Sequence, residues 1–177
     1  MKILGVIINN KLTWDENTQG IVKKVNQRMR LLRSVLSFGS TIPEMVHLWK
    51  LFCLSILEQS CVVWGSSLTE ENKEDLERTQ KSFAKLVLKE KYKDYNSALL
   101  NLNLETLSSR RDKLMMKFGK TSIENGKLHK FFPLRNTEHN MLLRDPDIYR
   151  VTKAHTQRFY HSSILHIQRL LNQERNI

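Results

Sequence analysis

The sequence predicts a mainly α-helical fold: a bundle of four to six helices with one short N-terminal β-hairpin. Over most of the 177 residues, apolar side chains recur at three- and four-residue steps, the spacing of helices with one buried face. Only residues 3–8 form an apolar run rich in β-branched side chains, which is typical of a strand. Threonine caps and glycines separate the periodic segments and mark where helices begin and end.

The hairpin is predicted within residues 3–14. Five of the six residues from Ile3 to Ile8 are apolar without alternation, so we expect this strand to be covered on both faces. Asn9 and Asn10 tolerate positive φ, and a reversal there would bring the chain up to Trp14 back beside the strand. A two-stranded ribbon is marginal alone, so either helices cover it or the rest of its sheet is missing.

The first helix is predicted from Trp14 to Ser37, with Thr13 and Glu16 forming a capping box. Its apolar stripe consists of Ile21, Val25, Met29, Leu32 and Leu36. Its opposite face and flanks carry Lys23, Lys24, Arg28, Arg30 and Arg33. Lysine and arginine on a rigid helix neutralise phosphates without reading sequence, so this face is either a nucleic-acid contact or a solvated surface.

Further helices follow from their caps and apolar stripes. They are expected at about 43–60, nearly apolar all round, at 69–89 with Thr69 as N-cap, at 96–100, at 106–124 and at 163–173. The 106–124 helix should turn Leu107, Leu114, Met115 and Phe118 inward. Arg110 and Arg111 lie in its first turns, an unfavourable end for cations, so we expect them to pair with a carboxylate or to meet a partner.

Composition limits the classes of function. A formal net charge of +11 favours an anionic partner, with nucleic acid ahead of a membrane surface, although a basic protein without such a partner has the same balance. No apolar run of about 18 residues and no signal sequence are present, so we expect an intracellular protein without a membrane partner. Cys53 and Cys61 are expected to be buried thiols, because the metal-binding spacings are absent.

The C-terminal extension lacks helical periodicity before Ser162. Bases and aromatics interleave at residues 149–153 and 158–161, a composition that binds single strands by stacking and phosphate contact. Packing of the aromatics onto the core explains the same composition and is the preferred interpretation. Asp145 and Asp147 flank a proline and are interpreted as turn residues.

Several short motifs follow one another along the chain. They are Leu4-Gly5-Val6, Asn10-Lys11-Leu12, Thr13-Trp14, Val63-Trp64, Leu76-Glu77-Arg78-Thr79-Gln80-Lys81, Leu104-Glu105-Thr106-Leu107-Ser108-Ser109-Arg110-Arg111 and Arg169-Leu170-Leu171-Asn172. In this order they resemble the C-terminal part of the reverse transcriptase of non-LTR (LINE-type, jockey-like) retrotransposons. The sequence departs from that pattern at Ile3, where an aromatic is usual, at Gln59-Ser60, where Tyr-Gly is common, and at Leu165, where proline is common.

The resemblance implies three parts: a primer-grip-like hairpin at 1–14 containing Leu4 and Gly5, a thumb-like helical bundle at 15–126, and a basic extension with a terminal helix at 127–177. The palm that precedes them in the family would be missing. Its aromatic-x-Asp-Asp turn holds two Mg²⁺ ions, and no Asp-Asp pair occurs in this sequence. We therefore expect no catalysis and no cofactor in this chain, since Mg²⁺ would belong to the missing palm.

The expected function is to grip a primer–template duplex of RNA or DNA by its backbone. The expected contacts are Lys23, Lys24, Arg28, Arg30, Arg110 and Arg111. A palm-bearing reverse transcriptase polypeptide is the second expected partner. The alternative is a protein-interaction module or an inert retrotransposon remnant that does not bind nucleic acid.

Overall fold

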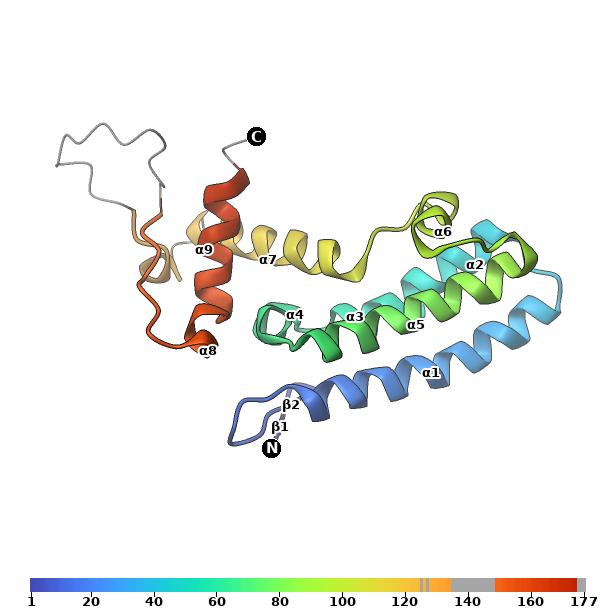
Figure 1. Ribbon diagram of the computed structural model, residues 1–177, viewed down its shortest axis with the longest axis horizontal. Helices are drawn as coiled ribbons and strands as arrows, with labels where there is room; N and C mark the ends of the chain where they lie inside the picture. Colours follow the sequence, from blue (N-terminus) through green and yellow to red (C-terminus); the bar gives the residue numbers. More distant parts are fainter. Residues whose placement is uncertain (125, 127, 135–148, 175–177) are drawn as a thin grey trace. The chain divides into compact units, whose positions relative to one another are not determined.

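The computed structural model describes residues 1–124, 126, 128–134 and 149–174. In chain order its strands and α-helices are β1 (Lys2–Ile3), β2 (Val6–Ile7), α1 (Asp15–Ser37), α2 (Ile42–Trp49), α3 (Ser55–Glu58), α4 (Cys61–Trp64), α5 (Glu70–Leu88), α6 (Tyr95–Leu102), α7 (Leu107–Glu124), α8 (Gln157–Tyr160) and α9 (Ser163–Gln173) (Figure 1). The mainly helical class with a short N-terminal hairpin is confirmed. The described residues contain more helical segments than the four to six predicted, and Asp145 and Asp147 lie outside them.

The chain divides into two compact units. Unit 1 comprises Met1–Cys61 and Leu68–Arg110, and unit 2 comprises Val62–Ser67 and Arg111–Ile177. These boundaries differ from the predicted divisions after residues 14 and 126. The hairpin belongs to the same unit as α1, and the boundary near the middle of the chain falls inside α7, whose later turns share a core with α9.

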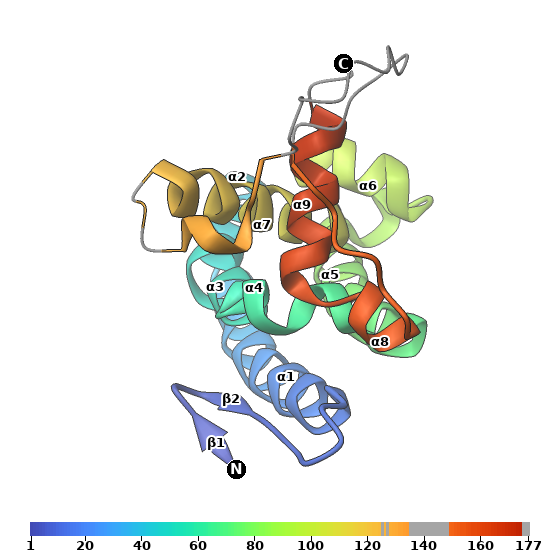
Figure 2. The ribbon, with the colours of Figure 1, turned by 90° about the vertical axis from the view of Figure 1, so that its left-hand side faces the viewer.

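The hairpin is present, but its turn is not at Asn9-Asn10. Lys2 pairs with Ile7 and Ile3 with Val6, so Leu4 and Gly5 form a two-residue turn. Both have positive φ, 46° for Leu4 and 87° for Gly5, as a type I′ hairpin turn requires. Figure 2 shows the two short strands beside the start of α1.

Asn9 instead organises the chain that leads into α1. Its side-chain oxygen accepts a hydrogen bond from the Thr13 amide at 2.9 Å, and its side-chain nitrogen donates to the Thr13 hydroxyl at 2.7 Å. Thr13 is therefore not the helix cap, and the predicted capping box is wrong. Trp14 takes the N-cap position without a side-chain hydrogen bond.

The hairpin is only partly covered, contrary to the expectation of a strand covered on both faces. Val6 is buried, and the Ile7 amide donates to the side chain of Asn17 on α1 at 3.0 Å. Ile3 and Leu4 remain 45% and 89% exposed. The apolar run is therefore divided between the two short strands and the turn that joins them, and Ile3 in β1 and Leu4 in the turn are exposed to solvent.

The core of unit 1 lies between α1, α5 and the segment from α2 to α3, and Figure 1 shows α1 alongside α5. The predicted stripe of α1 is confirmed at Ile21, Val25, Met29 and Leu32, which are all buried, while Leu36 is half-buried. At the centre of the unit, Trp49 stacks on Phe83 with ring centroids 4.5 Å apart and planes inclined by 14°.

The segment predicted as one buried helix at 43–60 is more complex. It begins with a capping box between Thr41 and Glu44, passes through a π-helical segment at Lys50–Leu54 and ends at Glu58. Leu51 and Phe52 are 54% and 47% exposed, so the prediction of an apolar surface buried all round is wrong.

The other helix predictions agree closely with the structure. Thr69 caps α5 by accepting from the Asn72 amide at 3.2 Å, and α9 has the predicted bounds. Within the described residues, no single helix is long and apolar enough to cross a membrane; the consecutive pair Ile42–Glu58 and Cys61–Ser67 meets that test by length and composition only.

Unit 2 is built on the contact between α7 and α9. Met115, Phe132, Ile167 and Leu171 form its buried cluster. Asp112 bonds His166 at 2.9 Å, and Lys120 bonds Glu174 at 2.7 Å, so polar pairs flank the apolar contact. Phe118, predicted to face inward, is 40% exposed.

Candidate nucleic-acid interface

The candidate interface is the exposed face of α1, which we call the α1 basic face and define as Lys23, Lys24, Arg28 and Arg30. All four side chains belong to exposed residues, and within the described part of the chain none forms an ion pair. No acidic residue follows Glu16 in α1. The helix carries these cations along about 11 Å of its length, because each residue adds about 1.5 Å.

The buried stripe holds this face in place. Val25 is 0% exposed and Met29 3%, and they lie on the side of the helix opposite Lys23 and Arg30. Because packing fixes the rotation of α1 about its axis, the charges need no folding step to reach a ligand. Only the lysine and arginine side chains themselves lose freedom on binding.

Cations on α5 have different surroundings. Lys73 pairs with Glu70 at 2.7 Å, Arg78 with Asp75 at 2.8 Å and Lys81 with Glu74 at 2.8 Å. The hydrogen bond from Lys81 lowers the pKa of Glu74. Positive charge on α5 is therefore locally compensated, whereas that on α1 is not.

Arg28 lies at the edge of the α1 basic face, toward the π-helical segment. Burial raises the pKa of the Cys53 thiol to about 11, and the charge of Arg28 acts in the opposite direction. Cys53 is thus a buried neutral thiol, as expected, and the thiol of Cys61 is also buried.

Arg110 and Arg111 are placed differently from the α1 cations. Arg110 forms an ion pair with Glu58, which raises the pKa of Arg110 and supplies the carboxylate that the sequence led us to expect. Arg111 is buried, with 4% of its surface exposed. Both are less accessible to a phosphate than the four α1 cations, so the proposal below is built on α1, and contact of Arg110 and Arg111 with nucleic acid stays a prediction.

Leu4 and Gly5 form the tip of the hairpin. A Cβ on Gly5 would lie 2.7 Å from the side-chain nitrogen of Gln59, and that nitrogen donates to the Leu4 carbonyl at 3.3 Å. Positive φ is uncommon for leucine, and this leucine is almost fully exposed. Sequence reasoning missed this geometry because it placed the turn at the asparagines.

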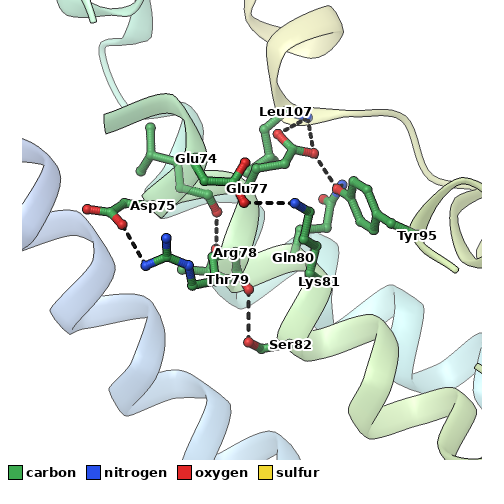
Figure 3. A network of polar contacts seen from close by, with 11 residues as sticks. Glu74, Asp75, Glu77, Arg78, Thr79, Gln80, Lys81, Ser82, Tyr95 and Leu107 are labelled. Atoms are coloured by element: carbon green, nitrogen blue, oxygen red, sulfur yellow. Dashed lines mark hydrogen bonds and ion pairs between the residues drawn. The ribbon is translucent and has the colours of Figure 1, made fainter. Parts of the chain in front are cut away.

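Two of the motifs that carry the family resemblance are in direct contact (Figure 3). The Glu77 carboxylate of α5 accepts the backbone N–H of Leu107, at 3.1 and 3.3 Å from its two oxygens, and also accepts the Tyr95 hydroxyl. The Gln80 side-chain nitrogen donates to the Tyr95 oxygen at 3.0 Å and to the Glu105 carbonyl at 2.8 Å. These residues therefore have a structural task, which is to fasten the start of α7 to α5.

The surroundings of Tyr95 follow from this network. Burial, and next the hydrogen bond to Glu77, raise the pKa of its hydroxyl. The Glu77 carboxylate also meets a backbone N–H at the first turn of α7, where negative charge is favourable. The motif spacing alone did not reveal this contact, because the paired residues are 30 positions apart.

The described residues contain no group of three or more histidine, cysteine, aspartate or glutamate side chains arranged to hold a metal ion. The candidate interface consists of the α1 cations and the exposed tip of the hairpin. No family model, curated protein or solved structure matches this chain.

Proposed function

We propose that this chain binds the backbone of a primer–template duplex through the α1 basic face, as the thumb-like part of a non-LTR retrotransposon reverse transcriptase. The observation that carries the proposal is that four exposed cations lie on one packed helix and form no ion pair with any residue that the structure describes. In this proposal the chain holds nucleic acid and performs no polymerase chemistry itself. Leu4 and Gly5, by the resemblance, would meet the primer terminus.

The charge pattern sets the expected strength of the salt effect. Each phosphate contact with duplex DNA contributes about −0.9 to the slope of log K against log salt, so four contacts give about −3.6. Affinity should then fall about 150-fold between roughly 50 and 200 mM salt. Such binding has little sequence preference, because phosphate contacts position a protein without reading bases.

The test measures binding of the full chain to a 20-base-pair RNA–DNA hybrid by fluorescence anisotropy at several salt concentrations. The variant is the triple change Lys23→Glu, Arg28→Glu and Arg30→Glu. The slope should lose about 2.7 of its magnitude, because three contacts of about −0.9 each are removed. A wild-type chain without salt-dependent affinity would sink the proposal.

The matched control reverses the same number of charges on α5, with Lys73→Glu, Arg78→Glu and Lys81→Glu. These cations are already paired with carboxylates, so their reversal should change the slope less. Equal losses in both triple variants would mean that net charge alone determines binding, and α1 would have no special part.

A second candidate function is docking to another polypeptide, supported by the exposed hairpin. Ile3 and Leu4 are 45% and 89% exposed, and among the described residues their sheet has two strands. Unpaired strand edges invite pairing. The natural partner under this proposal is a palm-bearing reverse transcriptase polypeptide. Co-purification that is lost on Ile3→Lys with Leu4→Lys would support docking, and absence of co-purification would remove it.

A further inference from the structure

The segment around α8 in unit 2 forms a second basic surface. From Tyr149 to Gln173 the sequence has four lysines and arginines, three histidines and no aspartate or glutamate. Arg150, Lys153 and Arg158 are exposed and form no ion pair within the described residues. The nearest following carboxylate, Glu174, is already paired with Lys120 at 2.7 Å.

The aromatic side chains of this segment separate into two kinds. Tyr149 is partly buried against the cluster around Met115, and Asn172 holds its backbone with hydrogen bonds of 3.0 and 3.1 Å. Packing, the preferred interpretation from sequence, therefore applies to Tyr149. Phe159 and Tyr160 differ, because they remain 44% and 45% exposed, and packing does not account for them.

The ring of Tyr160 is held in position by Arg169 of α9. The guanidinium carbon lies 4.0 Å from the ring centroid, and a guanidinium nitrogen donates to the Tyr160 carbonyl at 2.8 Å. His161 adds an edge-on contact with a centroid distance of 5.1 Å. These contacts hold the Tyr160 ring in place while much of its surface stays exposed. The ring is therefore already ordered for stacking, and less side-chain entropy is lost on binding.

We infer that the α8 surface, defined as Lys153, Arg158, Phe159, Tyr160 and Arg169, binds single-stranded nucleic acid. Phe159 and Tyr160 stack on unpaired bases, while Lys153 and Arg158 contact the adjoining phosphates. The surface serves single strands rather than duplexes, because the faces of stacked, paired bases are not available to exposed aromatic rings. The inference is independent of the α1 proposal, since it depends on different residues in the other unit.

A lipid surface is the less favoured ligand. Helices that lie on membranes present a broad apolar face over several turns. In contrast, α8 is a single turn, and its two exposed rings are accompanied by Arg158 and Lys153 rather than by further apolar side chains. The geometry therefore suits flat, stackable rings better than acyl chains.

The experiment compares two labelled probes with equal charge: a 20-nucleotide thymidine oligomer and an abasic deoxyribose-phosphate oligomer of the same length. A protein that contacts phosphates binds both probes, whereas a protein that stacks on bases binds the thymidine oligomer more tightly, because the abasic oligomer has no bases. We expect the full chain to prefer the thymidine oligomer, and the double change Phe159→Ala with Tyr160→Ala to reduce that preference at least tenfold, since one lost stack has about this effect. Tyr160→Phe keeps the ring and should retain the preference.

Phe118→Ala is the matched control, because this ring in the same unit is 40% exposed but lies on α7. It should leave the preference unchanged. Equal affinity of the wild-type chain for the two oligomers would overturn the inference, as would an undiminished preference in the double variant. If the double variant lost binding to phosphatidylserine vesicles but bound both oligomers as the wild-type chain does, the α8 surface would be a membrane-binding surface instead. The duplex assay with the α1 triple variant, run in parallel, separates failure of this inference from failure of the α1 proposal.

Discussion

Two mid-helix glycines should respond to the same substitution with opposite signs. Gly20 lies in α1 and Gly119 in α7, and in both helices glycine is about 1 kcal/mol less favourable than alanine. The difference lies in what an added Cβ would meet. At Gly20 it would lie 3.4 Å from the terminal methyl of Ile7, an ordinary contact with the flexible end of a side chain.

At Gly119 the added Cβ would lie 2.5 Å from Cγ2 of Ile167 and 3.2 Å from Cδ1 of Leu171. Cγ2 is attached directly to the β-carbon of a residue that is 1% exposed, so it moves only if α9 moves or the side chain leaves its rotamer. Overpacking of this kind costs about 1–3 kcal/mol. After the gain in helix propensity, we expect Gly119→Ala to destabilise unit 2 by about 1 kcal/mol.

Gly20→Ala should instead stabilise unit 1 by up to about 1 kcal/mol. Hydrogen exchange followed by mass spectrometry measures the stability of α1 and of α9 separately. The test therefore works whether or not the two units unfold together. In an Ile167→Ala background the close methyl is absent, and Gly119→Ala should no longer destabilise. Faster exchange in wild-type α9 than in the Gly119→Ala variant would refute the packing argument.

Other predictions concern the network around Glu77. In a urea titration, Glu77→Gln should destabilise unit 1 by about 1–3 kcal/mol, because a charge-assisted acceptor of a backbone N–H is lost. Glu74→Gln alters an exposed ion pair, so it should change the stability by no more than about 0.5 kcal/mol in the same titration. The raised pKa of Tyr95 means that the folded state holds this proton more tightly, so its contribution is present below pH of about 10 and declines above it. Tyr95→Phe should therefore flatten the loss of stability above pH of about 10. The pKa of Cys53 is also raised, so an unchanged loss in the Tyr95→Phe variant would assign the whole effect to Cys53 and contradict the prediction. Phe83→Ala should cost about 3–5 kcal/mol by removing the ring stacked on Trp49, and a loss below about 1 kcal/mol in calorimetry would contradict the assigned core.

Long amphipathic helices could be predicted from the sequence because their signal is local. The stripe from Ile21 to Leu32 and the Thr69 cap each depend on residues within a few turns of one another, and both occur as predicted. The π-helical segment at Lys50–Leu54 could not be predicted in this way, because a search for a 3.6-residue period assumes the helix that a π turn interrupts. Leu51 and Phe52 lie in this segment and are exposed.

The asparagines after the hairpin show that a local turn signal does not always form the turn it predicts. Asparagine pairs favour tight reversals, but Asn9 makes two hydrogen bonds to Thr13, and the turn forms where Leu4 accepts a positive φ. Prediction of the interface is limited because contacts between residues far apart in the sequence leave no local pattern. The basic face of α1 could be recognised locally, whereas the pairing of Arg110 with Glu58 spans 52 positions and depends on the packed fold.

The residues that carry the family resemblance and the cations of the α1 basic face are different sets. Glu77 and Gln80 in one motif fasten the backbone at Leu107 and Glu105 in the other, so a chain that keeps both motifs keeps the junction between α5 and α7. The α1 cations lie in none of the motifs. Loss of Glu77 should therefore lower stability without changing the salt slope of the folded protein, and reversal of the α1 charges should change the slope without lowering stability. If either variant altered both properties equally, fold and binding would depend on the same residues, and the resemblance could no longer be separated from the function proposed here.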